Sequence, residues 1–105
     1  MSNFFPDYDN FYSFFTNVTK TKIRVILEST EWTIRKESWN DFEFVNEWSE
    51  LHLASEESSP ILSGVITDPE TNFQKLIDVF KNFQVNFQAE LYDKEQVIVR
   101  CYKNS

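Results

Sequence analysis

The chain has 105 residues, of which 17 are acidic and 10 are basic, and its formal net charge of −7 excludes nucleic acid and anionic membranes as expected partners. This length predicts a single domain, and 11 Phe, 4 Tyr and 3 Trp supply enough apolar surface for a core, which excludes intrinsic disorder. One cysteine excludes an internal disulfide framework, and the lack of 18 consecutive apolar residues excludes a transmembrane helix.

The first predicted element is a helix over residues 6–18. Apolar residues recur there at helical spacing, Pro6 suits the first turn, and Asp7 and Asp9 complement the positive end of the helix dipole. These three residues also interrupt the apolar run, and no basic residue precedes it, so a secretory signal is not expected. A cytoplasmic location is the resulting prediction.

Two adjacent strands are expected next. Ile23, Val25 and Leu27 alternate with polar residues, and a second alternating run after a short polar break contains Trp32 and Ile34. A period of two is typical of half-buried strands, so the two runs predict a hairpin.

Residues 39–48 allow two interpretations. Phe42 and Phe44 alternate with acidic residues as in a strand, whereas apolar residues also recur at every third position as on a short helix: Trp39, Phe42, Val45 and Trp48. Both interpretations remain open. Further strands are expected at residues 50–53 and 61–67, and the second is apolar enough to be buried on both faces.

The clearest element is a helix over residues 69–84. Asp68 is well placed as its N-cap and Pro69 as its first helical residue. One apolar stripe runs along it, formed by Phe73, Leu76, Ile77, Phe80 and Phe83. We expect this stripe to pack on a sheet.

A C-terminal β-hairpin is expected to complete that sheet, with its first strand beginning at Val85. A two-residue loop would place Leu91 opposite Gln96, whereas a three-residue loop pairs apolar residues with one another: Leu91 with Val97, Ala89 with Val99, and Phe87 with Cys101. The hydrophobic pattern favours the longer loop. The full prediction is a single α+β domain over residues 1–105, with both helices on one face of a largely antiparallel sheet.

No catalytic, cofactor or metal-binding signature is present. The only glycine, Gly64, cannot build a phosphate-binding loop, and neither His52 nor Cys101 has an activating neighbour in the sequence. We expect a surface or half-buried histidine, a core cysteine, no metal or cofactor, and no enzymatic activity.

Charge distribution is the one functional signal. Nine carboxylates and no Lys or Arg lie between Glu37 and Gln74, whereas the other 67 residues hold eight acids and ten bases. Aromatic residues are interleaved with these acids, and protein interfaces combine aromatic anchors with charges that steer the partner. The expected binding residues for a basic protein partner are Glu37, Trp39, Asp41, Glu43, Glu47, Trp48, Glu50, Glu56 and Glu57.

In this overall profile the chain resembles the small acidic immunity proteins and antitoxins with which bacteria neutralise toxin nucleases. The resemblance implies a non-catalytic inhibitor that blocks the basic active site of a cognate nuclease by protein contact, without a cofactor. The alternative is a non-catalytic subunit or small-ligand module whose acids only form a solvated face. The sequence leaves the oligomeric state open.

Overall fold

The computed structural model describes residues 6–37, 41–54 and 57–104. Its elements in chain order are β1 (Phe11–Thr16), α1 (Lys20–Glu28), β2 (Thr33–Glu37), β3 (Phe42–Asn46), β4 (Ser49–Ala54), β5 (Ile61–Ile66), α2 (Pro69–Asn82), β6 (Asn86–Tyr92) and β7 (Ile98–Lys103). This order confirms the predicted α+β class.

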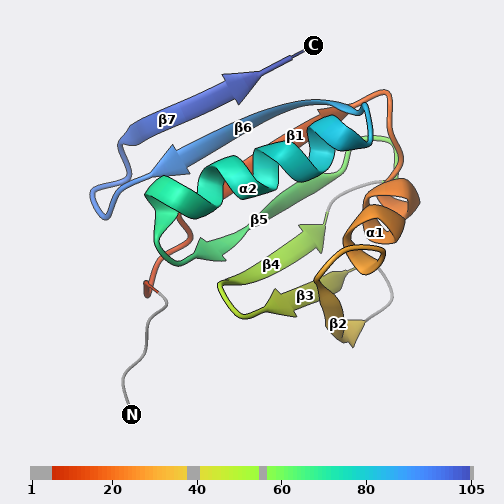
Figure 1. Cartoon of the computed structure of the whole chain (residues 1–105), viewed down its shortest axis with the longest axis horizontal. Coiled ribbons are helices and arrows are strands. Elements are labelled where there is room, and N and C mark those ends of the chain that lie inside the picture. Colours follow the sequence, from red (N-terminus) through yellow and green to blue (C-terminus); the bar gives the residue numbers. More distant parts are fainter. Residues whose placement is uncertain (1–5, 38–40, 55–56, 105) are drawn as a thin grey trace.

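The strands form one seven-stranded sheet in the order β2-β3-β4-β5-β1-β6-β7, and every neighbouring pair is antiparallel. The N-terminal strand β1 lies inside the sheet, between β5 and β6 (Figure 1). The edges of the sheet are therefore β2 and β7.

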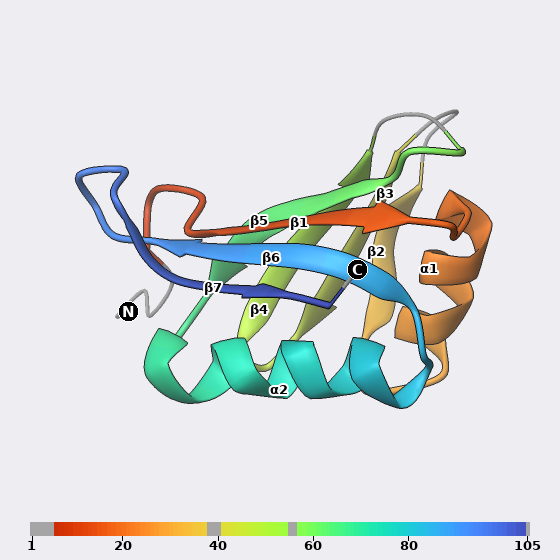
Figure 2. The same cartoon turned by 90° about the horizontal axis from the view of Figure 1, so that it is seen from above.

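Both helices lie on the same side of the sheet. Helix α2 runs along this side, and α1 lies at the end near β2 (Figure 2). Apolar side chains of both helices and of one face of the strands form a single core, with Ile23, Leu27, Phe44, Leu51, Leu62, Leu76, Phe80 and Phe87 among its members. The opposite side of the sheet, called the open face below, has no helix over it in the described part of the chain.

A strand replaces the predicted N-terminal helix, so that prediction is wrong. In β1 the side chains of Phe11, Ser13 and Phe15 are buried, whereas Tyr12 and Phe14 lie on the open face. Aromatic residues fit either period over so short a stretch, and the polar Ser13 at a buried position hid the period of two. Pairing with two strands from distant parts of the chain decides the conformation.

The two strands expected next are confirmed only in part: the second run forms β2, whereas the first is part of α1, so the predicted hairpin is wrong. Alternation would bury Val25, but this side chain is 52% exposed. The buried positions follow helical spacing instead: Ile23, Ile26 and Leu27. Thr19 begins the helix, since its side chain accepts a hydrogen bond from the backbone N–H of Lys22 at 3.1 Å.

The central region is a meander of strands. For residues 39–48 the strand interpretation is confirmed over β3, while residues 38–40 lie outside the described part. Strands β4 and β5 confirm the two strands expected after it. The expectation that β5 is buried on both faces is wrong, because Leu62, Gly64 and Ile66 are buried and the alternate residues are partly exposed.

Helix α2 confirms the predicted amphipathic helix and ends at Asn82. Four of the five stripe residues are buried in the core: Phe73, Leu76, Ile77 and Phe80. The fifth, Phe83, is the C-cap residue and is 39% exposed. Asp68 occupies the predicted N-cap position with φ 45°, but its side chain makes no capping hydrogen bond.

The C-terminal hairpin forms with a different register from the predicted one. Leu91 lies opposite Arg100 and Ala89 opposite Tyr102. The inward side chains of β7 are therefore Arg100, which lies over the ring of Phe73, and Tyr102, which packs against Phe87. Residues 97–99 and Cys101 are exposed, which corrects both the pairing of apolar residues and the core position of Cys101.

Neither of the two described helices is long and apolar enough to cross a membrane.

We predict that Phe80→Ala lowers the free energy of unfolding by about 3–5 kcal/mol, since it deletes a fully buried ring. Phe80 packs against Phe15 and Phe87, with ring centroids 4.9 and 5.5 Å away. Urea denaturation followed by tryptophan fluorescence measures the loss. The matched control is Phe83→Ala, at the exposed end of the same stripe. An equal loss in both variants would contradict this description of the core.

Candidate functional site

The open face carries rows of side chains that the strand register aligns. One row crosses the sheet from β3 to β6 as Glu43, His52, Ser63, Tyr12 and Glu90. Directly opposite residues of an antiparallel pair point to the same side of the sheet, so these polar side chains share one surface. Residues from five strands thus meet on a surface that no helix covers in the described chain.

An apolar strip, formed by the rings of Phe14, Tyr12 and Tyr92, crosses this polar row at Tyr12. Phe14 is opposite Ile61 of β5, and its ring is 39% exposed. Tyr12 contacts Tyr92 edge to face, with ring centroids 5.3 Å apart. The open face therefore offers apolar surface next to charged groups, which is the composition of many protein interfaces.

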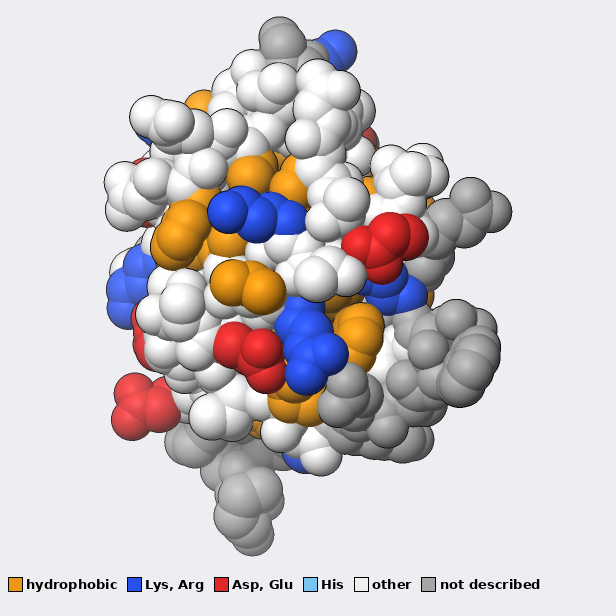
Figure 3. Space-filling model, turned by 90° about the vertical axis from the view of Figure 1, so that its right-hand side faces the viewer, with side chains coloured by type: hydrophobic (Ala, Val, Ile, Leu, Met, Phe, Trp, Pro, Cys, Tyr) orange, Lys and Arg blue, Asp and Glu red, His pale blue; other side chains and the backbone are white. Residues whose placement is uncertain are grey.

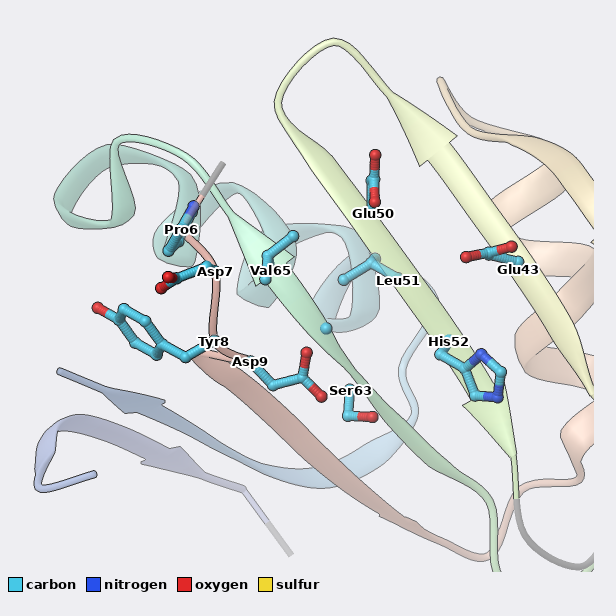
Figure 4. Close-up of a pocket in the computed structure, with 11 residues that line it drawn as sticks. Pro6, Asp7, Tyr8, Asp9, Glu43, Glu50, Leu51, His52, Ser63 and Val65 are labelled. Carbon is cyan, nitrogen blue, oxygen red and sulfur yellow. The ribbon is translucent and has the colours of Figure 1, made fainter. Parts of the chain in front are cut away.

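A hollow of about 600 Å³ adjoins the polar row. One wall is the N-terminal segment 6–9, and the other side consists of β3 and β4, with part of β5 between them (Figure 4). Figure 4 shows Asp7 and Asp9 on the N-terminal wall, with the carboxylate of Asp9 directed toward Ser63, and Glu50 and Glu43 on the far side of the hollow. Carboxylates thus border the hollow on two sides.

Asn10 positions the N-terminal wall. Its side-chain amide donates to the carbonyl of Ile66 at 3.0 Å and accepts from the backbone N–H of the same residue at 2.9 Å. The buried Asn10 side chain thus pairs with the backbone of Ile66, as a further residue of β1 would otherwise do. The backbone pairing of β1 with β5 therefore ends at Asn10, and residues 6–9 lie beside the open face. Sequence reasoning missed Asn10 because this residue lay inside the helix predicted over residues 6–18, although Asn before an apolar run is a typical turn signal.

Gly64 allows β4 and β5 to approach closely at the hollow. Its φ is +151°, and a Cβ atom there would lie 2.1 Å from the carbonyl oxygen of Glu50. Only glycine fits this contact, so the single glycine of the chain has a packing role in the site.

Arg35 is a basic residue among the carboxylates that line the hollow. Its guanidinium contacts Glu43 at 2.6 Å and Glu50 at 3.3 Å. The hydrogen bond to Glu43 is the main cause that raises the pKa of Arg35 above its ordinary value. Arg35 thereby holds two carboxylates of neighbouring strands in fixed positions.

The charge around the hollow remains strongly negative. Five carboxylates line it or lie at its border, against the one guanidinium of Arg35: Asp7, Asp9, Asp41, Glu43 and Glu50. The five carboxylates and the one guanidinium together carry a formal net charge of −4. A concave surface of one sign concentrates ions and side chains of the opposite sign.

The structure divides the nine sequence-predicted binding residues. Asp41, Glu43 and Glu50 lie together at the hollow, whereas Glu47 lies in the turn between β3 and β4. Glu37 ends β2. Trp39 and Glu56 lie outside the described residues. The acid-rich sequence segment is therefore not one surface, although its central part contributes to one.

Trp48 lies in the core. Its side chain is 8% exposed and contacts Trp32 edge to face at 5.2 Å between ring centroids. Its Nε1 donates to the carboxylate of Glu31 at 3.2 Å. This burial corrects the expectation that Trp48 offers an exposed ring to a partner. The exposed phenylalanine rings of the described residues are Phe14 on the open face and Phe83 at the end of α2, each 39% exposed.

Glu57 has a role within the fold. Its carboxylate accepts a hydrogen bond from the backbone N–H of Thr21 at 2.9 Å, and its carbonyl accepts one from the N–H of Lys20 at 2.8 Å. Glu57 thus satisfies two free amides at the start of α1. The hydrogen bond from Thr21 lowers the pKa of Glu57.

The end of the molecule near α1 has a different character from the open face. Figure 3 shows Lys and Arg side chains there among hydrophobic and acidic ones. Arg24 contacts Glu28 at 3.4 Å and lies over the ring of Phe42, 4.9 Å from its centroid. The described bases of this end are therefore interleaved with other groups, in contrast to the acids at the hollow.

Ser63, His52 and Asp41 are the residue types of a nucleophile, a base and an orienting acid, and they lie near one another on the open face. The Nε2 atom of His52 is 3.8 Å from the Oδ2 atom of Asp41, which exceeds hydrogen-bond length. Both side chains are about half exposed, at 49% and 46%. In a catalytic triad the base is hydrogen-bonded to the orienting acid, and His52 and Asp41 do not form that bond here. As expected for His52, its side chain lies at the surface.

Within the described residues, no group of three or more His, Cys, Asp or Glu side chains is arranged to hold a metal ion. Comparisons of the chain with models of protein families, with curated proteins and with solved structures found no match. The function has to be inferred from the chemistry of the open face.

We predict that Asn10→Ala destabilises the protein by about 1–3 kcal/mol, because it leaves the N–H and C=O of Ile66 buried without their partner. Asn10→Asp tests the direction of the bonds, since it keeps the acceptor and removes the donor. Thermal unfolding compares the variants. Full stability of Asn10→Ala would show that this side chain does not hold the N-terminal wall.

A pH-dependent effect is expected at Glu57. Because its pKa is lowered in the folded chain, its ionised form stabilises the fold above the ordinary value of 4.5, and this contribution disappears as the pH falls through the lowered pKa. We predict that Glu57→Gln is less stable than the parent at pH 7 and that the difference shrinks below pH of about 4. Glu47→Gln, at an exposed turn position, is the control. Urea denaturation across this pH range measures the stability of each protein. A stability difference between Glu57→Gln and the parent that stays constant with pH would contradict the assignment.

Proposed function

We propose that this chain is a non-catalytic binding protein whose open face engages a basic protein partner, as an immunity protein engages a toxin nuclease. One observation carries the proposal: five carboxylates and one guanidinium surround a hollow that adjoins exposed apolar surface. A cytoplasmic location remains a prediction.

The charges determine which partner fits. Lys and Arg side chains of a partner would enter a hollow that already holds carboxylates on two sides. A nuclease has such side chains in its active cleft, where they bind phosphate groups. Carboxylates in the positions of those phosphates would block the cleft, and the inhibitor would supply no chemistry.

The apolar strip supports an interface in the same place. Phe14 and the Tyr12–Tyr92 pair provide rigid rings next to the acids. Buried aromatic anchors supply much of the affinity in protein complexes, while surrounding charges mainly set the association rate and the specificity. The open face has both components within a few strands.

Arg35 favours binding by fixing the acids in advance. Its contacts with Glu43 and Glu50 restrict two flexible side chains before any partner arrives. A preorganised surface loses less side-chain entropy on association. The partner's cations also have to share these carboxylates with Arg35, which limits the contribution of this pair to affinity.

The alternative, a small-ligand module, fits the hollow less well. Ligand pockets are mainly apolar with a few polar groups. Charged side chains make up a large part of this lining, namely Asp7, Asp9, Glu43 and Glu50.

The first test uses three immobilised baits: the parent protein, Asp7→Lys with Asp9→Lys on the hollow wall, and Asp78→Lys with Glu95→Lys elsewhere. Both variants change the net charge equally, and all four positions are exposed. We predict that the parent and the second variant capture the same basic protein from a lysate of the source cells, and that the first variant does not. Equal capture by all baits would contradict binding at the hollow.

Kinetics with the captured protein separate steering from anchoring. We predict that reversing the charges at Asp7 and Asp9 slows association and weakens its salt dependence, whereas Phe14→Ala mainly speeds dissociation and costs about 2 kcal/mol or more if the ring is a hot spot. Surface plasmon resonance at low salt and at about 1 M salt, where the Debye length is about 3 Å, measures both. An association rate independent of salt would contradict the electrostatic part of the proposal.

A further inference from the structure

His52 is the single histidine of the chain, and it lies within the candidate site. It stands in the polar row between Glu43 of β3 and Ser63 of β5 and lines the hollow (Figure 4). Its side chain is 49% exposed, so protons reach it freely from solvent. Imidazole is the side chain whose ordinary titration falls between pH 5 and 8. A change in the charge of His52 therefore changes the charge of the hollow itself.

Carboxylates predominate among the described charged groups around His52. The Oδ2 atom of Asp41, just before β3, is 3.8 Å from Nε2, and Glu43 is the residue directly opposite on β3. On β4 itself, Glu50 lies two positions away and so points to the same face. Each of these acids is close enough to interact with an imidazolium ion.

The other elements beside His52 add little positive charge. Strand β5 places the uncharged Ser63 opposite it, and the N-terminal wall beyond contributes Asp7 and Asp9. Among the described side chains, the cation of this group is Arg35 of β2, which already contacts Glu43 and Glu50. A proton on His52 would thus add a second positive charge to a site that carries five negative ones.

We propose that protonation of His52 weakens the binding of the basic partner, so that the open face binds more tightly at neutral than at mildly acidic pH. This inference rests on the proposed function of the hollow. Neutral His52 leaves the surrounding groups with their charge of −4, whereas protonated His52 can pair with Asp41 and changes the total to −3. The imidazolium and the partner's Lys or Arg side chains then compete for the same carboxylates.

Coulomb's law sets the size of the effect. One unit charge about 6 Å from a partner's cation changes the affinity about threefold in surroundings as polar as water. Salt screens this interaction, so low ionic strength gives the largest change. Carboxylates titrate near pH 4 and are mostly ionised down to a pH of about 5.5, which leaves His52 as the group that changes charge. By linkage, a bound partner displaces the proton from His52 by the same factor.

Two substitutions of His52 imitate its two charge states. His52→Gln is neutral at every pH, and His52→Lys is always charged. The probe is hexaarginine with blocked termini, whose own charge is constant, and calorimetry measures its affinity in low salt at a pH of about 7.5 and of about 5.5. We expect the parent to match His52→Gln at the higher pH and His52→Lys, about threefold weaker, at the lower. An equal loss of affinity on acidification in the parent and in His52→Gln would overturn the inference.

The proton release gives a second readout. Because the chain has one histidine, its imidazole Hε1 signal is identified in the proton NMR spectrum without assignment of other residues. At a pH of about 6.5, hexaarginine is expected to move this signal toward the position of neutral imidazole. A signal that stays in place while the peptide binds at the hollow would overturn the regulation by His52 and leave the proposed function intact.

The variant Asp7→Lys with Asp9→Lys separates the two failures. It alters the N-terminal wall and keeps His52, and circular dichroism shows whether it folds. We expect it to bind hexaarginine more weakly than the parent at both pH values. Equal binding by this variant and the parent would contradict the hollow as the binding site, and the proposed function and this inference would then both fail.

Discussion

The pairing of β1 with both β5 and β6 is the interaction on which the rest of the structure depends. It joins the meander β2 to β5 to the C-terminal strands β6 and β7, which otherwise share no sheet contact. Both pairings connect residues far apart in the sequence, so the loss of chain entropy has to be offset by burial. Phe11 and Phe15 supply this burial through contacts with Phe73, Phe80 and Phe87.

The insertion of β1 also creates the candidate site. Asn10 ends the strand by bonding to Ile66, and the residues before it form one wall of the hollow. Because both helices cover one side of the sheet, the alternate residues of five central strands remain on the open face. The fold thus brings acids from the N-terminus and from β3 and β4 together, although they are about forty residues apart.

The two ends of the strand order differ in charge. Acids gather toward β3 and β4, while the β7 edge is cationic and apolar. Surfaces this far apart can bind independently, because exposed charges separated by more than a Debye length are largely screened at physiological salt.

The sequence by itself determined those elements in which local signals agree. Helix α2 has a proline at its first position and a clear apolar stripe, and the runs of β4 and β5 are bounded by polar residues, although the two-sided burial expected for β5 was wrong. The concentration of acids was also evident, and three of the predicted binding residues meet at the hollow: Asp41, Glu43 and Glu50.

Only the tertiary structure decided the segments whose local patterns allow two conformations. Residues 11–16 and 20–28 have apolar positions that fit either period, so strand pairing selected β1 and burial of Ile26 selected α1. The register of β7 depended on Arg100 and Tyr102 packing on aromatic rings, which apolar alternation cannot predict. Burial of Trp48 and the surface position of Cys101 followed from the same long-range packing, because exposure is a property of the assembled layers and not of the residue type.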